Sequence, residues 1–376
     1  MKIIIAPDSF KGSLSGKEAA EAMLQAIRAV FPDATCIVLP ISDGGEGAAH
    51  VLASALPGKF YQKQVCGPYE KPVQASYYLT ESRLGIVELA EAAGLTLTTP
   101  GERNPLYATT FGVGELLLDA VANGATQLCL TLGGSATNDG GAGIAKALGI
   151  RLLNRDGKEI APNCAGLEEL AHIDAAGMRP EFREIPILIA CDVKNPLCGP
   201  EGASHIYGPQ KGADAHMVGQ MDAILAHYET LLSDASSNQS LGALAGSGAA
   251  GGAALPLLAF CNAKIVSGID LVLDTLEFER HLQSADLVLT GEGKIDGQTK
   301  YGKAIEGIIA RAQNKNVPVW AFAGLLEKAE AGRQQVRFWG INPPGQSREE
   351  SMRSAFENLR SSCQKALEEL QELVGA

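Results

Sequence analysis

The sequence has few features of proteins that bind nucleic acid or zinc. Its 376 residues carry a formal net charge of −12, and no run of five Lys or Arg residues occurs. A uniformly acidic surface repels nucleic acid and anionic lipid, so we expect neither as a partner. The six histidines form neither HxH nor HExxH, so no zinc site is visible. An anionic substrate would therefore need a local group of lysines.

Signals for disulfides, secretion and membrane insertion are also missing. None of the eight cysteines lies in a CxxC pair, and several lie within apolar runs, where cysteine acts as a small hydrophobic residue. A reducing compartment is the simpler interpretation. The apolar run at the N-terminus is too short for a signal peptide, and no run approaches the roughly 18 residues of a membrane span. These features predict a cytoplasmic protein.

The chain instead has ample apolar content, at 46%, and many glycines, 43 in all. The glycines collect at the ends of predicted strands, which is typical of loops shaped around ligands. At about 150 residues per domain, the length predicts two domains and leaves three open.

Both ends of the chain predict a doubly wound α/β fold. Buried strands alternate with helices near the N-terminus, and the same style returns from Ala285. Ser15 and Glu18 form a capping-box pattern at the start of the first helix. We therefore expect a doubly wound parallel sheet built from residues 1–60 and 285–376. A second domain is expected to be inserted, and the cleft between the two domains is the expected ligand site.

The inserted domain, residues 61–284, is predicted to be mixed α/β. Two alternating segments around Gly67-Pro68 indicate antiparallel strands, and a hairpin is expected to turn at Asp156-Gly157. The small-residue stretch 246–260 could be a linker, but its apolar content favours a closely packed helix. The final stretch, from about Ser347, has the spacing of an amphipathic helix. It could pack internally or against a second copy, which leaves a homo-oligomer open.

The stretch LGGSATNDGGAG, residues 132–143, has the strongest local signal. It follows a predicted buried strand and precedes a predicted helix, and its polar residues lie between pairs of glycines. Such a stretch can be a tight turn with a helix cap, or a loop that binds an anion through N–H groups and hydroxyls. The number of glycines and polar residues favours the ligand loop.

Five glycine-marked polar loops follow predicted strands: 8–13, 43–47, 133–141, 192–199 and 291–297. Several contain carboxylates that could hold a hard cation: Asp43, Glu46, Asp139, Asp192, Glu292 and Asp296. Lysines that could face phosphate are Lys11, Lys194, Lys211, Lys294 and Lys303. This combination suits phosphoryl transfer. Glu88 and Glu91 are instead expected to form local ion pairs.

Two further motifs are weak. Gly246–Gly251 fits GxGxxG, but no strand is predicted before it, so a dinucleotide site and a nicotinamide dehydrogenase are poorly supported. Residues 297–304 nearly match the Walker A pattern, but Ala304 stands where a Mg²⁺-binding Ser or Thr is needed.

Six motifs, in order along the chain, resemble those of the type 1 bacterial glycerate kinase family. They are DSFKGS (8–13), SDGGEG (42–47), GGSATNDGG (133–141), CDVKNPLCGP (191–200), GPQKGA (208–213) and TGEGKID (290–296). The resemblance implies two α/β domains, the first flavodoxin-like. It also implies ATP- and Mg²⁺-dependent phosphorylation of D-glycerate.

The resemblance and the loops together suggest roles for individual residues. Asp192 is expected to orient or deprotonate the glycerate hydroxyl, and Lys11 to neutralise developing charge or hold the substrate carboxylate. Asp43 or Asp296 is expected to hold Mg²⁺. The residues expected to contact ATP are Gly133, Gly134, Ser135, Thr137, Asn138 and Lys211.

The product is expected by resemblance to be 2-phosphoglycerate, with 3-phosphoglycerate as the alternative. A non-catalytic sensor of nucleotide or sugar acid on the same scaffold is a further alternative.

Overall fold

A computed structural model of the chain describes residues 1–10, 12–42, 47–238, 240–295, 303–326 and 335–375. The chain divides into two compact units. Unit 1 comprises Met1–Asp43 and Ile269–Ala376, and unit 2 comprises Gly44–Gly268. The boundaries lie before the expected positions near residues 60 and 285. One reason is that α2 (Ala48–Ala55) packs on strands of unit 2.

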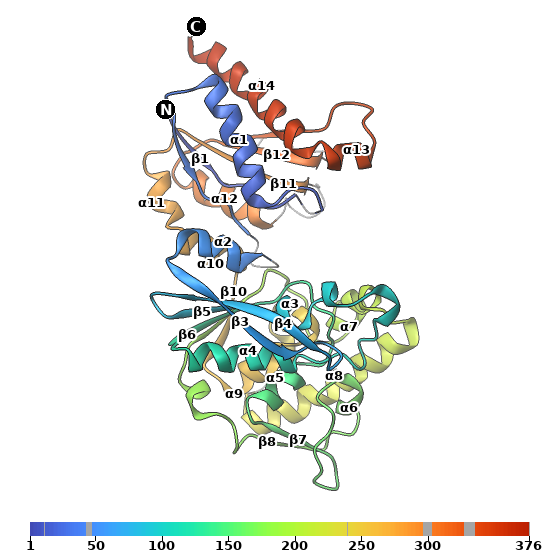
Figure 1. The fold of residues 1–376 in the computed structure, drawn as a ribbon. Helices are drawn as coiled ribbons and strands as arrows, with labels where there is room; N and C mark the ends of the chain where they lie inside the picture. The colour runs from blue at the N-terminus through green and yellow to red at the C-terminus, as the bar shows by residue number, and fades with distance from the viewer. Residues whose placement is uncertain (11, 43–46, 239, 296–302, 327–334, 376) are drawn as a thin grey trace. The chain divides into compact units, whose positions relative to one another are not determined.

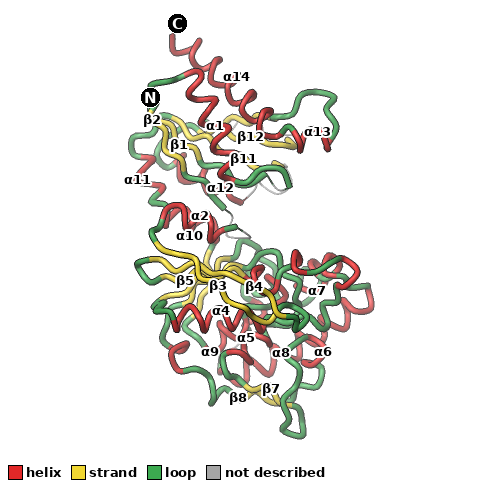
Figure 2. The backbone as a smooth tube through the Cα atoms, viewed as in Figure 1, coloured by secondary structure: helices red, strands yellow, loops and turns green. Residues whose placement is uncertain are grey.

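Unit 1 contains a five-stranded sheet in which every pair of neighbours is parallel (Figures 1 and 2). The strand order is β13-β12-β11-β1-β2. Numbered along this unit alone, the order is 2-1-3-4-5, which is the flavodoxin-like order. The expectation of a flavodoxin-like, doubly wound domain is therefore confirmed. The strands are β1 (Lys2–Ile5), β2 (Thr35–Val38), β11 (Leu287–Ile295), β12 (Val319–Leu326) and β13 (Val336–Gly340).

Helices cover both faces of this sheet, which explains its continuous apolar strands. On one face, α1 (Gly16–Val30) and α14 (Ala355–Gly375) lie side by side and share a core with Ile3 and Ile5 (Figure 1). Ile4, which points to the other face, is also fully buried. The remaining helices of the unit are α10 (Gly268–Thr275), α11 (Phe278–Leu282), α12 (Lys303–Gln313) and α13 (Arg348–Arg353).

Local sequence patterns explain the start of α1 and the packing of α14. Ser15 and Glu18 form the expected capping box at the start of α1. The apolar face of α14 packs internally, with Leu359, Cys363 and Leu367 buried in the core of unit 1. The chain therefore uses this amphipathic helix to cover its own sheet.

Unit 2 contains a mixed six-stranded sheet in the order β10-β9-β6-β5-β4-β3 (Figure 1). The first four strands are parallel, and β4 and β3 extend the sheet as the expected antiparallel pair. Their bounds are β3 (Gly58–Cys66), β4 (Pro72–Thr80), β5 (Leu84–Glu88), β6 (Gln127–Thr131), β9 (Ile187–Ala190) and β10 (Ala263–Val266). The unit thus joins a parallel half, where ligand loops are expected, to a hairpin edge.

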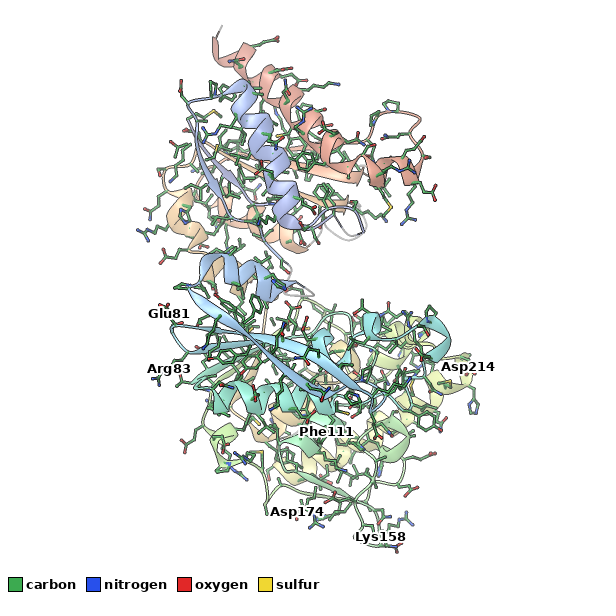
Figure 3. The ribbon with its side chains drawn as sticks, viewed as in Figure 1. Glu81, Arg83, Phe111, Lys158, Asp174 and Asp214 are labelled. Carbon is green, nitrogen blue, oxygen red and sulfur yellow. The ribbon has the colours of Figure 1, made fainter. Side chains whose placement is uncertain are left out.

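Two short strands and several helices complete unit 2. β7 (Arg151–Leu153) pairs with β8 (His172–Asp174), and the turn at Asp156-Gly157 adds only an isolated bridge between Leu153 and Glu159. Lys158 and Asp174 mark this end of the unit in Figure 3. The helices after α2 are α3 (Leu89–Ala93), α4 (Phe111–Ala122), α5 (Ala142–Ala147), α6 (Cys164–Leu167), α7 (Ala203–Tyr207), α8 (Ala215–Ser236) and α9 (Leu255–Phe260).

Three expectations about secondary structure were wrong or incomplete. The stretch 246–260 is not one helix, because Gly246, Ala250, Gly251 and Gly252 have positive φ and only the last part forms α9. The loop expected at 291–297 begins later, because β11 continues to Ile295 beside β12. The long helix α8 was missed, although Asp214 caps it and Met221, Leu225, Tyr228 and Leu232 have helical spacing (Figure 3).

Within the described residues, no helix combines the length and apolar character that a membrane crossing requires.

Candidate functional site

In unit 1 the strand order reverses between β1 and β11, and polar groups gather at the carboxyl ends of these two strands. Asp8 follows β1, is 8% exposed, and its backbone N–H donates to Gly291 O at 2.9 Å. The hydroxyl of Thr290, on β11, donates to Ala6 O at 2.8 Å. In open α/β sheets, ligands bind beyond the carboxyl ends of the strands at such a reversal.

Three of the predicted site residues cannot be located relative to this edge. Lys11, Asp43 and Asp296 lie outside the described residues, as does Glu46. Among the residues that the structure describes, no group of three or more His, Cys, Asp or Glu side chains could hold a metal ion. A Mg²⁺ ion commonly uses one or two carboxylates and completes its shell with water and phosphate oxygens. Asp43 and Asp296 carry the carboxylate oxygens that such a site uses, and their role as ligands stays a prediction.

In unit 2, the turn from β6 to α5 contains the predicted ligand loop. Gly134 has φ +63° and is exposed, and Gly133 is half-buried. Ser135 is 6% exposed, whereas Thr137 and Asn138 are completely buried. The loop therefore has an accessible end at Gly133–Gly134 and an internal end at Thr137–Asn138.

Asp139 forms the centre of the internal end. Its Oδ2 accepts hydrogen bonds from Thr110 N, Thr110 Oγ1 and Gly143 N, and its Oδ1 accepts one from Gly141 N. The side chain is completely buried, and this burial raises its pKa although the four hydrogen bonds act in the opposite direction. Asp139 thus joins the starts of α4 and α5 and is not placed to hold a cation at the surface.

The segment 246–252 packs directly behind this loop. Gly251 O accepts a hydrogen bond from Gly140 N at 2.9 Å. A Cβ atom on Gly251 would lie 2.4 Å from Thr137 O, and one on Gly140 would lie 2.7 Å from the Tyr228 ring. Gly251, the last glycine of the GxGxxG match, is therefore required for the close packing of these two loops. No strand leads into the match, so the structure gives no support for a dinucleotide site.

Lys211 and Ser204 also contact the loop from its buried side. Lys211 is 1% exposed, and its ammonium nitrogen donates to Thr137 O at 2.6 Å. Burial lowers the pKa of Lys211 to about 7, although the charge of Asp139 favours the ammonium form. The amide nitrogen of Asn138 donates to Ser204 Oγ at 3.0 Å. Thr137 Oγ1 and Asn138 Oδ1 are buried and have no hydrogen-bond partner in the part of the chain that the structure describes.

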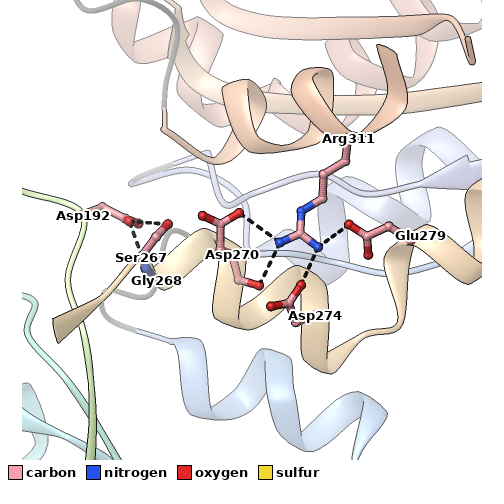
Figure 4. Close-up of polar contacts among 7 residues, drawn as sticks. All are labelled: Asp192, Ser267, Gly268, Asp270, Asp274, Glu279 and Arg311. Atoms are coloured by element: carbon pink, nitrogen blue, oxygen red, sulfur yellow. Dashed lines mark hydrogen bonds and ion pairs between the residues drawn. The ribbon is translucent and has the colours of Figure 1, made fainter. Parts of the chain in front are cut away.

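Asp192 lies just beyond the carboxyl end of β9. Its Oδ1 accepts hydrogen bonds from Ser267 Oγ at 3.1 Å and Gly268 N at 2.9 Å (Figure 4). The side chain is half-buried. Lys194, in the same loop, is exposed. The hydrogen bonds from Ser267 and Gly268 therefore fix the orientation of the Asp192 carboxylate.

Glu88 was expected to form an ion pair, and that expectation was wrong. It ends β5, and its carboxylate accepts hydrogen bonds from Gly47 N at 3.0 Å and Ala49 N at 2.6 Å. Burial raises the pKa of Glu88. Glu91 similarly accepts from the backbone N–H and hydroxyl of Ser76. An acid that directly ends a buried strand was the sequence signal for this role.

An ion-pair cluster in unit 1 was not expected from the sequence. Arg311 on α12 contacts the carboxylates of Asp270 and Asp274 on α10 and of Glu279 on α11 (Figure 4). The Arg311 side chain is only 14% exposed. The cluster fixes α10, which begins where the chain re-enters unit 1, against α12.

Comparison with known proteins gives a consistent result. The model of the "Glycerate kinase family" matches residues 3–371. The "Glycerate kinase" of Bacillus subtilis (strain 168) is 45% identical over 87% of this chain and 86% of its own length. The "Glycerate 2-kinase" of Escherichia coli (strain K12) is 42% identical, with coverages of 87% and 86%.

A solved structure shows the same similarity across the fold. A crystal structure from Salmonella typhimurium LT2, described as a candidate glycerate kinase 2, superposes with a TM-score of 0.88. The two chains are 40% identical, and the match covers 100% of each.

Proposed function

Because the chain belongs to the glycerate kinase family and is an enzyme of that kind, we propose that it phosphorylates D-glycerate with ATP to form 2-phosphoglycerate and ADP. The observation that carries the choice of product is the 42% identity to the relative called "Glycerate 2-kinase". The unpaired state of all eight cysteines supports a cytoplasmic setting, because thiols stay reduced there.

The ATP phosphates are proposed to bind at the accessible end of the β6–α5 loop. Gly133 and Gly134 are the members of this loop that solvent reaches most, and a left-handed glycine allows close approach of a ligand to the backbone. Ser135, Thr137 and Asn138 belong to the same proposed site, with the two buried residues shaping the loop from within. Lys211 belongs to the proposed ATP site as the residue whose ammonium group donates to Thr137 O.

Asp192 is proposed as the group that orients or deprotonates the glycerate hydroxyl. Its position beyond a parallel strand and its two fixed hydrogen bonds support this role, because a general base must be held within reach of the proton it takes. Lys11 is proposed to neutralise charge that develops on the transferred phosphoryl group or to hold the substrate carboxylate. Asp43 and Asp296 are proposed to hold Mg²⁺, which would neutralise phosphate charge when bound.

Replacement of Asp192 by Asn tests the assignment of the base. The turnover number should fall by about 10²-fold or more, because proton transfer by a positioned side chain contributes at least that factor. Asp156→Asn is the matched control, since Asp156 is exposed in a turn. Near-normal turnover in a folded Asp192→Asn protein would remove Asp192 from this role without affecting the family assignment.

The product is tested by ³¹P NMR of the reaction mixture. Glycerate-dependent consumption of ATP should accompany a resonance from the 2-phosphate ester. A 3-phosphate resonance would support the alternative product and refute ours.

A further inference from the structure

We propose that Lys211 is a positioning residue that fixes the ligand loop from its buried side through the Thr137 carbonyl, without itself touching ATP. The inference rests on the proposed ATP site at Gly133–Gly134. It concerns how that site keeps its shape.

The burial of the Lys211 ammonium group is unfavourable, so a specific interaction of this group must offset its cost. Lysine is almost never fully buried, because removal of an ammonium group from water costs several kcal/mol. Lys211 is nevertheless 1% exposed, at the end of the 3-10 turn Pro209–Lys211. An apolar side chain of similar length would fill the same volume without that cost. The position therefore uses the ammonium group itself.

The ammonium group acts at the middle of the ligand loop. Its acceptor, Thr137 O, lies between the exposed glycines and the buried Asp139. The neutral contacts of the loop run elsewhere: Ala136 N donates to Ala93 O, and Gly140 N donates to Gly251 O. A charge-assisted hydrogen bond is about twice as strong as a neutral one. Lys211 thus provides the strongest single restraint on this carbonyl.

The surroundings explain why a strong restraint is needed here. Thr137 Oγ1, Asn138 Oδ1 and Tyr228 OH are all buried near the loop without hydrogen-bond partners among the described residues. Incompletely satisfied polar groups favour alternative backbone arrangements that would satisfy them. A cation on Thr137 O opposes such rearrangement at the middle of the loop.

The same geometry argues against a direct contact between Lys211 and phosphate. The donor already points to a backbone carbonyl, and the side chain has almost no exposed surface. A Cβ atom on the next residue, Gly212, would lie 2.6 Å from Arg103 O, so the backbone at this point is closely packed. Lys211 could reach a phosphate at the loop surface only after this packing had opened.

The test compares Lys211→Met with Lys158→Met, which removes an exposed lysine in the connection between β7 and β8 (Figure 3). It is made below pH 7, where the ammonium form of Lys211 predominates. Lys211→Met should raise KM for ATP by about tenfold or more, the size expected from one hydrogen bond to a charged group. KM for glycerate should change less than about threefold if the loop contacts ATP alone. Hydrogen exchange of the loop peptide 132–143 should accelerate. Lys211→Arg, which keeps the charge, should restore part of the affinity.

Thermal stability separates this role from a merely structural one. Because Lys211→Met removes a buried charge, its melting temperature should equal or exceed that of the wild type while ATP affinity falls. A fall in stability with equal loss of both substrates would overturn the proposal. If Lys211→Met does not fold, Lys211→Gln, which keeps a neutral donor, is measured in its place.

Two further outcomes distinguish the proposal from its premise. Loss of ATP affinity with unchanged loop exchange would mean that Lys211 contacts ATP directly, which refutes positioning. Wild-type KM and wild-type exchange in Lys211→Met would also refute it. If the wild-type protein instead binds ATP in calorimetry but makes no phosphoglycerate, the proposed function fails while the loop measurements still decide the role of Lys211.

Discussion

Replacement of Asp139 by alanine would remove the acceptor of four hydrogen bonds at the internal end of the ligand loop. Three of the donors are backbone N–H groups, those of Thr110, Gly141 and Gly143. Each is buried and would have no replacement acceptor, at about 1–3 kcal/mol apiece. Relief from burial of the carboxylate charge offsets part of this sum. We expect unit 2 to lose about 3–5 kcal/mol, a large share of ordinary domain stability.

Asp139→Asn should be milder. An amide oxygen in place of Oδ2 can still accept from Thr110 and Gly143, so only the bond from Gly141 N is lost. The expected loss is about 1–3 kcal/mol. Asp156→Asn is the control, and it should change stability by less than about 0.5 kcal/mol because Asp156 lies in an exposed turn.

The assay can separate the two units because both tryptophans, Trp320 and Trp339, belong to unit 1. Urea unfolding followed by tryptophan fluorescence therefore reports unit 1, whereas far-ultraviolet circular dichroism reports both units. The Asp139 variants should shift the dichroism transition more than the fluorescence transition. An unfolding free energy for Asp139→Ala within about 1 kcal/mol of the wild type would refute the reasoning that this carboxylate holds α4 and α5 together.

Three other predictions use the same assays. Gly134→Asn should weaken ATP binding with little loss of stability, because Asn tolerates the φ of +63°. Gly134→Val should lose both ATP affinity and stability, because a β-branched residue does not tolerate that φ. Equal affinity for ATP in calorimetry of Gly134→Asn and the wild type would place the phosphates elsewhere. The pKa of Lys211 falls to about 7 on folding, so between pH 7 and its ordinary value of 10.5 the unfolded chain binds more protons than the folded chain. The unfolding free energy of the wild type should therefore rise with pH relative to that of Lys211→Met. A constant difference between their urea-unfolding free energies across that range would contradict the shift. Arg311→Met should destabilise unit 1 by about 1–3 kcal/mol in the fluorescence transition, since it leaves three carboxylates together without their cation; no shift would show that these half-exposed pairs contribute little.

The flavodoxin-like unit could be predicted well because its signals are local. Three consecutive isoleucines in β1 are buried, as a strand covered on both faces requires. Ser15 and Glu18 mark the start of α1 with a pattern that spans four residues. Each of these features is decided by neighbours in sequence, whereas the strand order is known only from the structure.

The helix expected at 246–260 failed because its backbone is decided by distant residues. Its alanines and glycines are compatible with a helix by composition. The positive φ angles of Gly251 and Gly252 instead fit the segment against Thr137 and Leu197. Contacts with residues so much earlier in the chain leave no periodic signal in the segment itself. The missed helix α8 is different, since Asp214 and the spacing of Met221 and Leu225 were readable.

The ligand loop shows why polar residues among glycines do not all mean ligand contact. Thr137, Asn138 and Asp139 resemble Ser135 in type and spacing, yet they are completely buried. Burial is acceptable for Asp139 because four donors from two helix starts converge on it. Those donors belong partly to Thr110, almost thirty residues earlier, so the sequence of the loop alone could not assign them.

The buried and exposed ends of the loop differ in which N–H groups could bind a phosphate. A phosphate needs N–H groups that are not already used, and Asp139 has taken those of Gly141 and Gly143 at the start of α5. The start of this helix is therefore neutralised by the protein's own carboxylate. The N–H groups that we propose for phosphate binding therefore lie at the earlier, more exposed end of the loop, at Gly133 and Gly134.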